Sequence, residues 1–479
     1  MARLHEYQGK PILSKAGIPA PRGEVARSGS EAVRVAGVLG GPVVVKAQAW
    51  TTSRAAQGGI AFADTPAQAG AHAERMLATT FGQFPVTEVL VEEKLRFNRE
   101  LFLSIAIDER ARAPVMILSG AGGSGVEERV SSAARIACDV VGGPDGAALD
   151  AAVRGLNLTE KTASLLKAIA RKAFDTARAI DARSLEINPL VETPEGELIA
   201  ADCRITVDDY AVSRHPELGI EIARELDHPP TALERQAYRV EQEDHRGTFF
   251  FAQMAREAAS GSRGLVGFHG AGGGGSMMAM DAVTSQGLTV ANFCDTSGNP
   301  SPAKVYRAAR IILSQPGLVG YFGSGSGVAS QEQFWSAYGL AKAFWELDLD
   351  IPAVIRLGGN TEDRAVEILR TACAGLKARV EGYRKNDPPA AIAARFSQLV
   401  SEGQCALWAP RAPRRPAFAT GSRGVAFTLR QGTAWVSRDV WRSDAAAIMG
   451  RAPGLFRDAD GGPVAAIHGD EPRQCGTSR

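Results

Sequence analysis

The 479-residue sequence lacks the features that mark membrane, secreted and disulfide-rich proteins. No run approaches the roughly 18 consecutive apolar residues of a membrane-spanning helix, and the N-terminus has no apolar signal core. The six cysteines, at positions 138, 203, 294, 373, 405 and 475, show no CxxC spacing, so neither a zinc site nor a disulfide framework is expected. We therefore expect a cytoplasmic protein with reduced thiols and no membrane association.

An excess of charge of one sign is also lacking. The 54 Lys and Arg residues nearly balance 53 Asp and Glu residues, and a net charge of +1 gives no reason to expect a nucleic-acid partner. Glycine, by contrast, is abundant at 52 of 479 residues, against a usual share of about 7%. Glycine allows tight loops in which the backbone approaches a ligand, and the length predicts two or three domains.

The predicted domains are residues 1–245, 246–395 and 396–479. The first alternates helical and strand patterns, with strands expected at 41–46, 89–92 and 101–107 and a helix capped by Thr159. The second repeats a strand, a glycine loop and a helix, which predicts a doubly wound parallel sheet. Its glycine loops, at 269–275 and 323–327, fall at the strand ends where ligands bind in such sheets.

The third region is rich in Pro, Gly and Ala, and from residue 405 onward it has eleven Arg, no Lys and six acidic residues. The segment 424–429 favours some strand, but the pattern leaves open whether the region is a small β-rich appendage or largely disordered. No chemistry is assigned to it.

The most informative segment is Ser184–Leu190 followed by Glu197–Asp202, which predicts a β-hairpin. The turn at 193–196 has Pro early and Gly late, as a tight connection requires. Symmetric pairing places Asn188 opposite Asp202, and Glu186 opposite Arg204. Because opposed side chains lie roughly 5 Å apart, Asn188 and Asp202 would offer two hard oxygen ligands suited to Mg²⁺. An ordinary hairpin with a polar outer face is the alternative.

Six short motifs follow one another along the chain: Leu4–Gln8, Gly17–Pro21, Val45–Gln48, Glu186–Val191, His269–Gly272 and Ala291–Phe293. In sequence and in order they resemble the β subunit of succinyl-CoA synthetase, an ATP-grasp acid–thiol ligase. The resemblance covers residues 1 to about 395. It implies an α/β protein with an ATP-grasp domain, a flavodoxin-like CoA-ligase domain with a doubly wound parallel sheet, and a C-terminal extension.

The resemblance also implies roles for individual residues. Lys46 would reach the nucleotide phosphates, Ser53, Arg54 and Ala55 would cover them, and Asn188 and Asp202 would bind Mg²⁺. Glu92 and Leu95 would lie beside adenine, and Glu100 would accept a hydrogen bond from the ribose. The acid substrate would contact His269, Gly325, Ser326 and Gly327, and Arg54 and His269 are the candidate catalytic residues.

Two regions depart from the family pattern. In the phosphate-covering loop, Ala56 stands where a lysine is usual and Thr52 and Ser53 replace glycines, which removes one positive charge. At the substrate end, His269 replaces an asparagine, and an imidazole can carry charge near neutral pH. The segments 323–328 and 295–299 are also rebuilt. These changes predict an acid other than succinate.

We therefore expect the β-type subunit of an ADP-forming carboxylate–CoA ligase. It would use Mg²⁺, ATP or GTP, and CoA, and form an αβ or α₂β₂ heteromer with an α-type, CoA-binding subunit that carries a phosphohistidine. Two alternatives stay open. Succinate itself is the substrate, or the chain is a weakened regulatory or scaffolding paralogue that binds nucleotide and the α partner.

Overall fold

The computed structural model describes residues 2–50, 54–123, 133–224, 226, 228–325, 329–403 and 407–414, and two short strands at 430–431 and 434–435. These residues divide into two compact units, 1–230 and 231–479. The sequence placed this boundary at 245. The difference arises from helix α7 (Ala232–Glu243), whose Ala237 and Val240 are buried in the core of the second unit.

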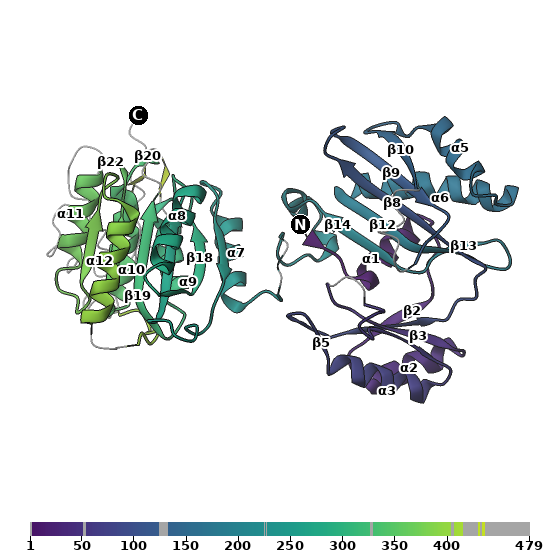
Figure 1. The fold of residues 1–479 in the computed structure, drawn as a ribbon, viewed down its shortest axis with the longest axis horizontal. Coiled ribbons are helices and arrows are strands. Elements are labelled where there is room, and N and C mark those ends of the chain that lie inside the picture. The colour runs from purple at the N-terminus through teal and green to yellow at the C-terminus, as the bar shows by residue number, and fades with distance from the viewer. Residues whose placement is uncertain are drawn as a thin grey trace, which may run out of the picture. The chain divides into compact units, whose positions relative to one another are not determined.

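The first unit contains two antiparallel sheets, and helices pack on each of them (Figure 1). The smaller sheet has the order β2-β7-β3-β4, and helices α2 and α3 cover it. Its elements are β2 (Gly23–Ala26), α2 (Gly29–Leu39), β3 (Val43–Ala47), β4 (Ile60–Ala63), α3 (Pro66–Leu77) and β7 (Val89–Glu93), with a small hairpin of β5 (Thr80–Phe81) and β6 (Phe84–Pro85).

The larger sheet has eight strands in the order β1-β14-β12-β8-β9-β10-β11, with β13 paired to β12. Helices α1, α5 and α6 contribute to its core or pack beside it. Its elements are β1 (Ala2–Arg3), α1 (Glu6–Lys15), β8 (Arg99–Asp108), β9 (Ala113–Ser119), β10 (Ala134–Asp139), β11 (Gly143–Pro144), α5 (Gly146–Arg154), α6 (Glu160–Ala179), β12 (Ala182–Glu192), β13 (Leu198–Ala200) and β14 (Cys203–Val207), followed by the 3₁₀ helices η2 (Asp209–Arg214) and η3 (Pro216–Leu218).

The strands and the helix expected in this unit are confirmed. The strand predictions correspond to β3, β7 and β8. Thr159 caps α6, because its side chain accepts a hydrogen bond from the backbone N–H of Thr162. The predicted hairpin is formed by β12, β13 and β14, and Gly196 has a φ of 76° at its turn, a conformation that favours glycine.

The second unit is a doubly wound α/β sheet (Figure 1). Its elements are β15 (Phe250–Gln253), β16 (Leu265–Ala271), α8 (Gly273–Thr284), β17 (Thr289–Val290), β18 (Asn292–Asp295), α9 (Pro302–Ile312), β19 (Leu318–Gly325), β20 (Ala329–Glu332), α10 (Phe334–Glu346), β21 (Ala353–Arg356), β22 (Gly359–Asn360), α11 (Glu362–Ala372), β23 (Val380–Tyr383) and α12 (Pro389–Glu402). Two further short strands are β24 (Arg430–Gln431) and β25 (Ala434–Trp435).

The strand order of this sheet is β15-β18-β16-β19-β21-β23. The strands β18, β16, β19, β21 and β23 run parallel. When these five are numbered by their order along the chain, their order in the sheet is 2-1-3-4-5, as in flavodoxin-like sheets. The predicted parallel sheet is therefore confirmed for these strands. The edge strand β15 pairs antiparallel with β18, so the complete sheet is mixed.

Helices cover both faces of the sheet because alternate strand residues point to opposite sides. Leu265 and Tyr321 belong to a core that includes residues of α7, α9, α10 and α11. Their neighbours Val266 and Phe322 belong to a second core, which α8 and α12 complete on the other face.

Two loops expected from the glycines begin later than predicted. The strand β16 continues to Ala271 and β19 continues to Gly325, because the parallel ladder between them extends to that pair. Glycine permits the close packing there, since a Cβ atom at Gly270 would lie 2.2 Å from Oγ of Ser276 in α8.

The predicted boundary at 395 falls inside α12, and the segment 407–414 also packs on the second unit. Trp408 is 1% exposed, exchanges backbone hydrogen bonds with Gly317 and Leu318, and donates from its indole nitrogen to Leu313. The predicted strand at 424–429 lies outside the described residues.

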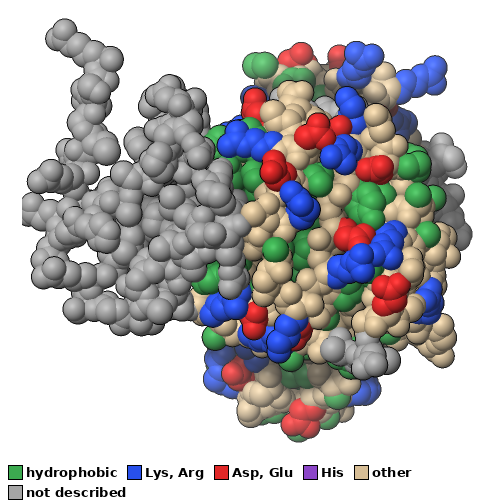
Figure 2. Space-filling view, turned by 90° about the vertical axis from the view of Figure 1, so that its left-hand side faces the viewer, with side chains coloured by type: hydrophobic (Ala, Val, Ile, Leu, Met, Phe, Trp, Pro, Cys, Tyr) green, Lys and Arg blue, Asp and Glu red, His purple; other side chains and the backbone are tan. Residues whose placement is uncertain are grey.

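None of the described helices combines the length and the hydrophobicity needed to span a bilayer. On the face drawn in Figure 2, basic and acidic side chains are interspersed with tan and green atoms. Among the described residues drawn on that face, no broad field of one sign is present.

Candidate functional site

The hairpin brings its polar side chains together in the predicted register. Glu186 pairs with Arg204, and the backbone N–H of Asn188 donates to the carbonyl of Asp202 at 3.2 Å. The four side chains line one cavity. The prediction that Asn188 and Asp202 lie opposite each other in the hairpin is therefore confirmed.

Beside the hairpin lies a buried cluster of two lysines and two glutamates from α1, β3 and β7. We call Glu6, Lys10, Lys46 and Glu92 the lysine–carboxylate cluster. Lys46 Nζ lies 2.7 Å from Glu6 Oε1 and 2.9 Å from Glu92 Oε2. Lys10 Nζ lies 2.8 Å and 2.5 Å from the same two carboxylates. Both ammonium groups donate to the carbonyl oxygen of Ala201, which ties the cluster to the hairpin.

Arg54 connects the cluster to Asp202. Its guanidinium Nη2 lies 2.9 Å from Glu6 Oε2 and 2.8 Å from Asp202 Oδ2, and Nη1 donates to the carbonyl of Ala47. The Asp202 side chain is 25% exposed, whereas that of Glu6 is 1% exposed. Asp202 is thus the carboxylate of this group that faces the open part of the cavity.

The charges in this region balance. Burial alone would raise the pKa of Glu6, but Lys46, Lys10 and Arg54 outweigh burial and hold that pKa well below its usual range. Burial opposes the charged form of Lys46 too, yet Glu6, Glu92 and Asp202 raise its pKa. Burial and Glu6 raise the pKa of Asp202, against the attraction of Arg54. Three cations therefore face three carboxylates, and an entering phosphate chain has to compete with those carboxylates.

This charge balance bears on the predicted Mg²⁺ site. A carboxylate such as Asp202 repels phosphate unless a cation lies between them. Asn188 accepts a hydrogen bond at Oδ1 from Gly123 at 2.8 Å and donates from Nδ2 to Glu186 at 3.3 Å. One carboxylate and one amide oxygen fit Mg²⁺, which keeps several waters and phosphate oxygens as ligands. Within the described residues, no cluster of three or more His, Cys, Asp and Glu side chains offers a fuller protein shell.

The cavity has a volume of about 1170 Å³. It is lined by most of the residues that the sequence assigned to the nucleotide and the metal: Lys46, Arg54, Ala55, Glu92, Leu95, Glu100, Asn188 and Asp202. Ser53 lies outside the described residues. The Glu92 carboxylate is 2% exposed and faces Lys10 and Lys46, and its place beside adenine stays a prediction.

Sequence reasoning missed the charge partners Glu6 and Lys10. They lie four positions apart on α1, and that spacing on a helix was the available signal. It also missed Phe62 and Phe97, which line the cavity although 61% and 48% exposed. Lys94 lies 5.2 Å from the Phe62 ring centroid. Two exposed aromatic rings offer flat apolar surfaces of the kind on which a nucleobase stacks.

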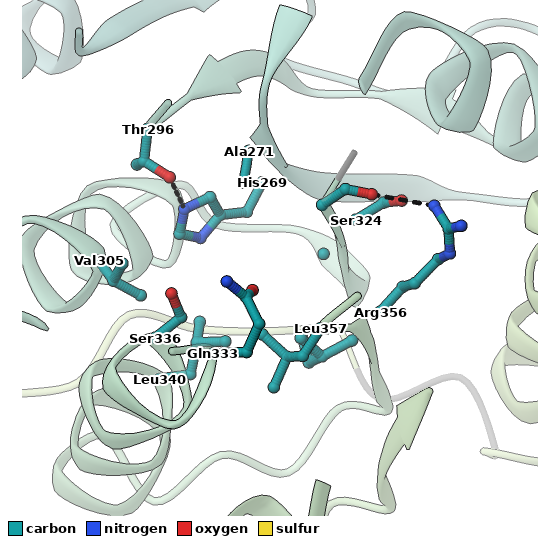
Figure 3. Close-up of a pocket in the computed structure, with 13 residues that line it drawn as sticks. His269, Ala271, Thr296, Val305, Ser324, Gln333, Ser336, Leu340, Arg356 and Leu357 are labelled. Atoms are coloured by element: carbon teal, nitrogen blue, oxygen red, sulfur yellow. Dashed lines mark hydrogen bonds between the residues drawn. The ribbon is translucent and has the colours of Figure 1, made fainter. Parts of the chain in front are cut away.

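In the second unit, His269 lies near the end of β16, and both of its ring nitrogens have hydrogen-bond partners; Figure 3 shows the one to Thr296. Its Nε2 lies 3.1 Å from Thr296 Oγ1, and its Nδ1 lies 2.5 Å from the Tyr321 hydroxyl. The Thr296 hydroxyl itself donates to the carbonyl of Gly270 at 3.2 Å. This network assigns the proton of the neutral ring to Nε2, with Nδ1 accepting from Tyr321.

The expectation that His269 carries charge near neutral pH is corrected. Burial lowers the pKa of His269 to about 4, because the imidazolium would lose its hydration without gaining a carboxylate partner. The sequence could not show this, since the residues around the ring include members of α9 and α10, which are distant along the chain. At pH 7 this side chain is a neutral hydrogen-bonding group.

Stability should consequently fall on acidification in a way that depends on His269. The folded pKa lies below the unfolded value near 6.5, so the stability contribution is complete above pH 6.5 and is lost as the pH falls toward 4. Between pH 7 and pH 5 the loss should reach about 2 kcal/mol, at about 1.4 kcal/mol per pH unit. We expect the thermal unfolding temperature of the wild type to fall further between pH 7 and pH 5 than that of the His269→Asn variant. Parallel pH profiles would contradict the assignment.

His269 lies at the switch point of the sheet. The strands β18 and β19 flank β16, and His269 is paired with Gly323 and Ala271 with Gly325. Open α/β sheets bind ligands at this place, outside the carboxyl ends of the strands. Gly325 and His269 line a small cavity there, whereas Ser326 and Gly327 lie outside the described residues.

Comparisons with known proteins agree with this architecture. Residues 3–192 match the model of the ATP-grasp domain family. A succinate–CoA ligase [ADP-forming] subunit beta of Roseiflexus sp. (strain RS-1) is 34% identical over 376 residues, which cover 77% of this chain and 93% of that protein. A succinate–CoA ligase [GDP-forming] subunit beta of Thermus thermophilus is also 34% identical, over 76% of this chain and 93% of its own length.

A solved structure shares the fold across both units. ATP citrate lyase from Methanothrix soehngenii, in complex with citrate and coenzyme A, superposes with a TM-score of 0.68 at 17% identity. The match covers 84% of this chain and 99% of that one.

Proposed function

The chain belongs to the family of succinate–CoA ligase β subunits, and from this premise we propose how it acts. It is the nucleotide-binding β-type subunit of a carboxylate–CoA ligase that forms ADP or GDP. An acid is activated as an acyl phosphate and captured by CoA, and an α-type partner carries the phosphoryl group on a histidine. The observation that carries the proposal is the convergence of Lys46, Arg54, Asn188 and Asp202 on one cavity.

The cavity residues have different roles according to their charge. Lys46 and Arg54 bind phosphate oxygens once the nucleotide draws them from Glu6, Glu92 and Asp202. Asn188 and Asp202 would hold Mg²⁺, which supplies the positive charge that lets a carboxylate face a triphosphate. Phe62 and Phe97 offer surfaces for the base. The relatives are ADP-forming and GDP-forming, so the proposal covers both nucleotides.

In the second unit, His269 and Gly325 are the described residues proposed to contact the acid, together with Ser326 and Gly327 of the adjoining segment. The proposed acid is not succinate, because a neutral imidazole replaces the amide of the family at this position. The N-terminus of α8 begins beside this strand end, and Asp295 accepts the N–H of Gly272 there at 2.8 Å. A helix N-terminus favours a phosphoryl group, which suits the phosphohistidine of the α partner.

The test reconstitutes the chain with its α partner and labels the terminal phosphate of Mg-ATP or Mg-GTP. We expect label on the partner histidine with release of the nucleoside diphosphate and, when CoA and a suitable acid are added, formation of an acyl-CoA with the label released as inorganic phosphate. A panel of mono- and dicarboxylic acids then identifies the substrate. Absence of label on the partner with both nucleotides would overturn the proposal.

A second candidate is a weakened paralogue that binds nucleotide and the α partner for regulation. It is favoured by Ala56, which lines the nucleotide cavity where the family has a lysine. The same experiment separates the two. Nucleotide binding by calorimetry without transfer of label would support the paralogue, whereas labelled partner and acyl-CoA product would support the ligase.

A further inference from the structure

The small cavity beside His269 lies between the sheet and the helices α9 and α10. Its volume is about 30 Å³, which is enough for one or two small groups. We call it the histidine pocket, and the residues that give it its character are His269, Thr296, Gln333, Ser336, Leu340 and Leu357.

The polar groups of this pocket are neutral. His269 has both nitrogens engaged by Thr296 and Tyr321, and it carries no charge at pH 7. Figure 3 shows the Gln333 amide and the Ser336 hydroxyl pointing toward the same space as the His269 ring. Ser336 is 7% exposed, and Ser324, which also lines the pocket, is 2% exposed, with a hydroxyl that has no hydrogen-bond partner among the described residues. A buried hydroxyl of this kind is available to a ligand.

A positive charge comes near the pocket only at its edge. Arg356 lines the cavity, but its guanidinium donates to the backbone carbonyls of Gly325 at 3.0 Å, Arg384 at 3.4 Å and Lys385 at 2.5 Å. In Figure 3 the Arg356 head group lies away from His269, Gln333 and Ser336. A carboxylate inserted beside these residues would be buried without an ionic partner, and that burial is costly.

Four further side chains of the wall are aliphatic. Val305, Leu340, Ile355 and Leu357 contribute only hydrocarbon surface. The pocket thus combines aliphatic walls with the hydroxyls of Ser324 and Ser336, which can donate and accept hydrogen bonds, and with the Gln333 amide, whose Nε2 also donates to the carbonyl of Gln331 at 3.1 Å. A hydroxyl on a short aliphatic chain matches this set, because it also donates and accepts.

We infer that the histidine pocket selects acids whose far end is uncharged and bears a hydroxyl, in preference to dicarboxylic acids. The inference rests on the proposed function and names its substrate class. The reacting carboxylate stays outside the pocket, where it can meet the phosphoryl donor and CoA. Gln333 and Ser336 are then specificity-determining residues that contact the far end of the acid.

The test compares matched acids with the reconstituted complex. At four carbons the trio is 4-hydroxybutyrate, butyrate and succinate, and equivalent trios are used at three and five carbons. At the preferred length we expect kcat/KM for the hydroxy acid to exceed that for the methyl acid by about tenfold or more, and that for the diacid by about 100-fold or more. A diacid used as well as the hydroxy acid at every length would overturn the inference.

Ser336→Ala supplies the variant. Alanine is favoured in helices, so α10 should form normally. We expect the ratio of kcat/KM between the hydroxy acid and the methyl acid to fall by about five- to tenfold, as loss of one hydrogen bond to a buried group implies. The matched control is Ser314→Ala, at an exposed serine just after α9, which should leave the ratio unchanged. An unchanged ratio in Ser336→Ala would overturn the assignment.

The outcomes keep the two proposals apart. Label on the α partner together with preferred use of a diacid retains the ligase and removes the inference. Failure of any nucleotide to label the partner removes the proposed function, and the inference with it.

Discussion

The variant Asp202→Asn should lower phosphoryl transfer from Mg-ATP to the α partner by tens- to hundreds-fold. The substitution keeps the size of the side chain and one carbonyl oxygen, but it removes the negative charge proposed to bind Mg²⁺. The structure places this carboxylate 2.8 Å from Arg54 and opposite Asn188, facing the cavity proposed to bind the nucleotide. Transfer of label to the partner at saturating Mg²⁺ measures the effect.

The same variant should change metal-free nucleotide binding in the opposite direction. Without the Asp202 charge, Arg54 loses one of its two carboxylate partners and the cavity becomes more positive. We therefore expect calorimetry in excess EDTA to show several-fold tighter binding of ATP to the variant than to the wild type. Mere damage to the site would weaken both forms of binding, so the opposite signs distinguish loss of a metal ligand from damage.

Glu197→Gln is the matched control for Asp202→Asn. Glu197 directly follows the turn of the same hairpin, but its side chain is 54% exposed and pairs with Lys161 on the surface. Its transfer rate should equal that of the wild type. Unchanged transfer in Asp202→Asn, with the control also unchanged, would remove Asp202 from the metal site.

Glu6→Gln should cost the first unit about 3–5 kcal/mol of stability. The Glu6 carboxylate is 1% exposed and lies within 3 Å of Lys10, Lys46 and Arg54. Glutamine leaves these buried cations with only Glu92 and Asp202 as partners. Urea unfolding near pH 7, monitored by circular dichroism of the whole chain, measures the loss. The exposed pair Glu24–Arg34 supplies the control, because Glu24→Gln should change stability little.

The effect of Glu6→Gln should also depend on pH. The pKa of Glu6 in the folded protein lies well below 4.5, so the stabilisation from its ionised form is complete above about pH 5. It is lost as the pH falls through 4.5 toward the folded pKa. The difference between wild type and variant should therefore be largest near neutrality and shrink in acid. A difference that stays constant down to pH 3 would contradict the charge-pairing account.

Local sequence patterns were sufficient to predict those parts of the structure that depend on residues close together along the chain. The turn at 193–196 fixes the register of the hairpin, and a period of two residues then decides which side chains share a face. The repeated glycine loops likewise indicated the parallel strands of the second unit. The mixed character of that sheet was missed, because the edge strand β15 is only four residues long.

The residue roles at the nucleotide site are still predictions, although eight of the assigned residues line one cavity. The sequence offered no means to foresee that Glu92 turns to the lysines, since its partner Lys10 is 82 positions away. The same distance hid the balance of charges around Arg54 and Asp202. Such contacts arise from packing between elements, and packing has no local signature.

The sequence by itself determined the family, the order of the two folds and the pairing of Asn188 with Asp202, because motifs and strand register depend on short stretches of chain. The tertiary structure alone decided which charges meet and which are suppressed. Helix α1 supplies Glu6 and Lys10 to the lysine–carboxylate cluster beside Arg54, and burial lowers the pKa of His269, which lies beside residues of α9 and α10, to about 4. Ionisation depends on desolvation and on the nearest opposite charges, and both are set by elements distant in sequence.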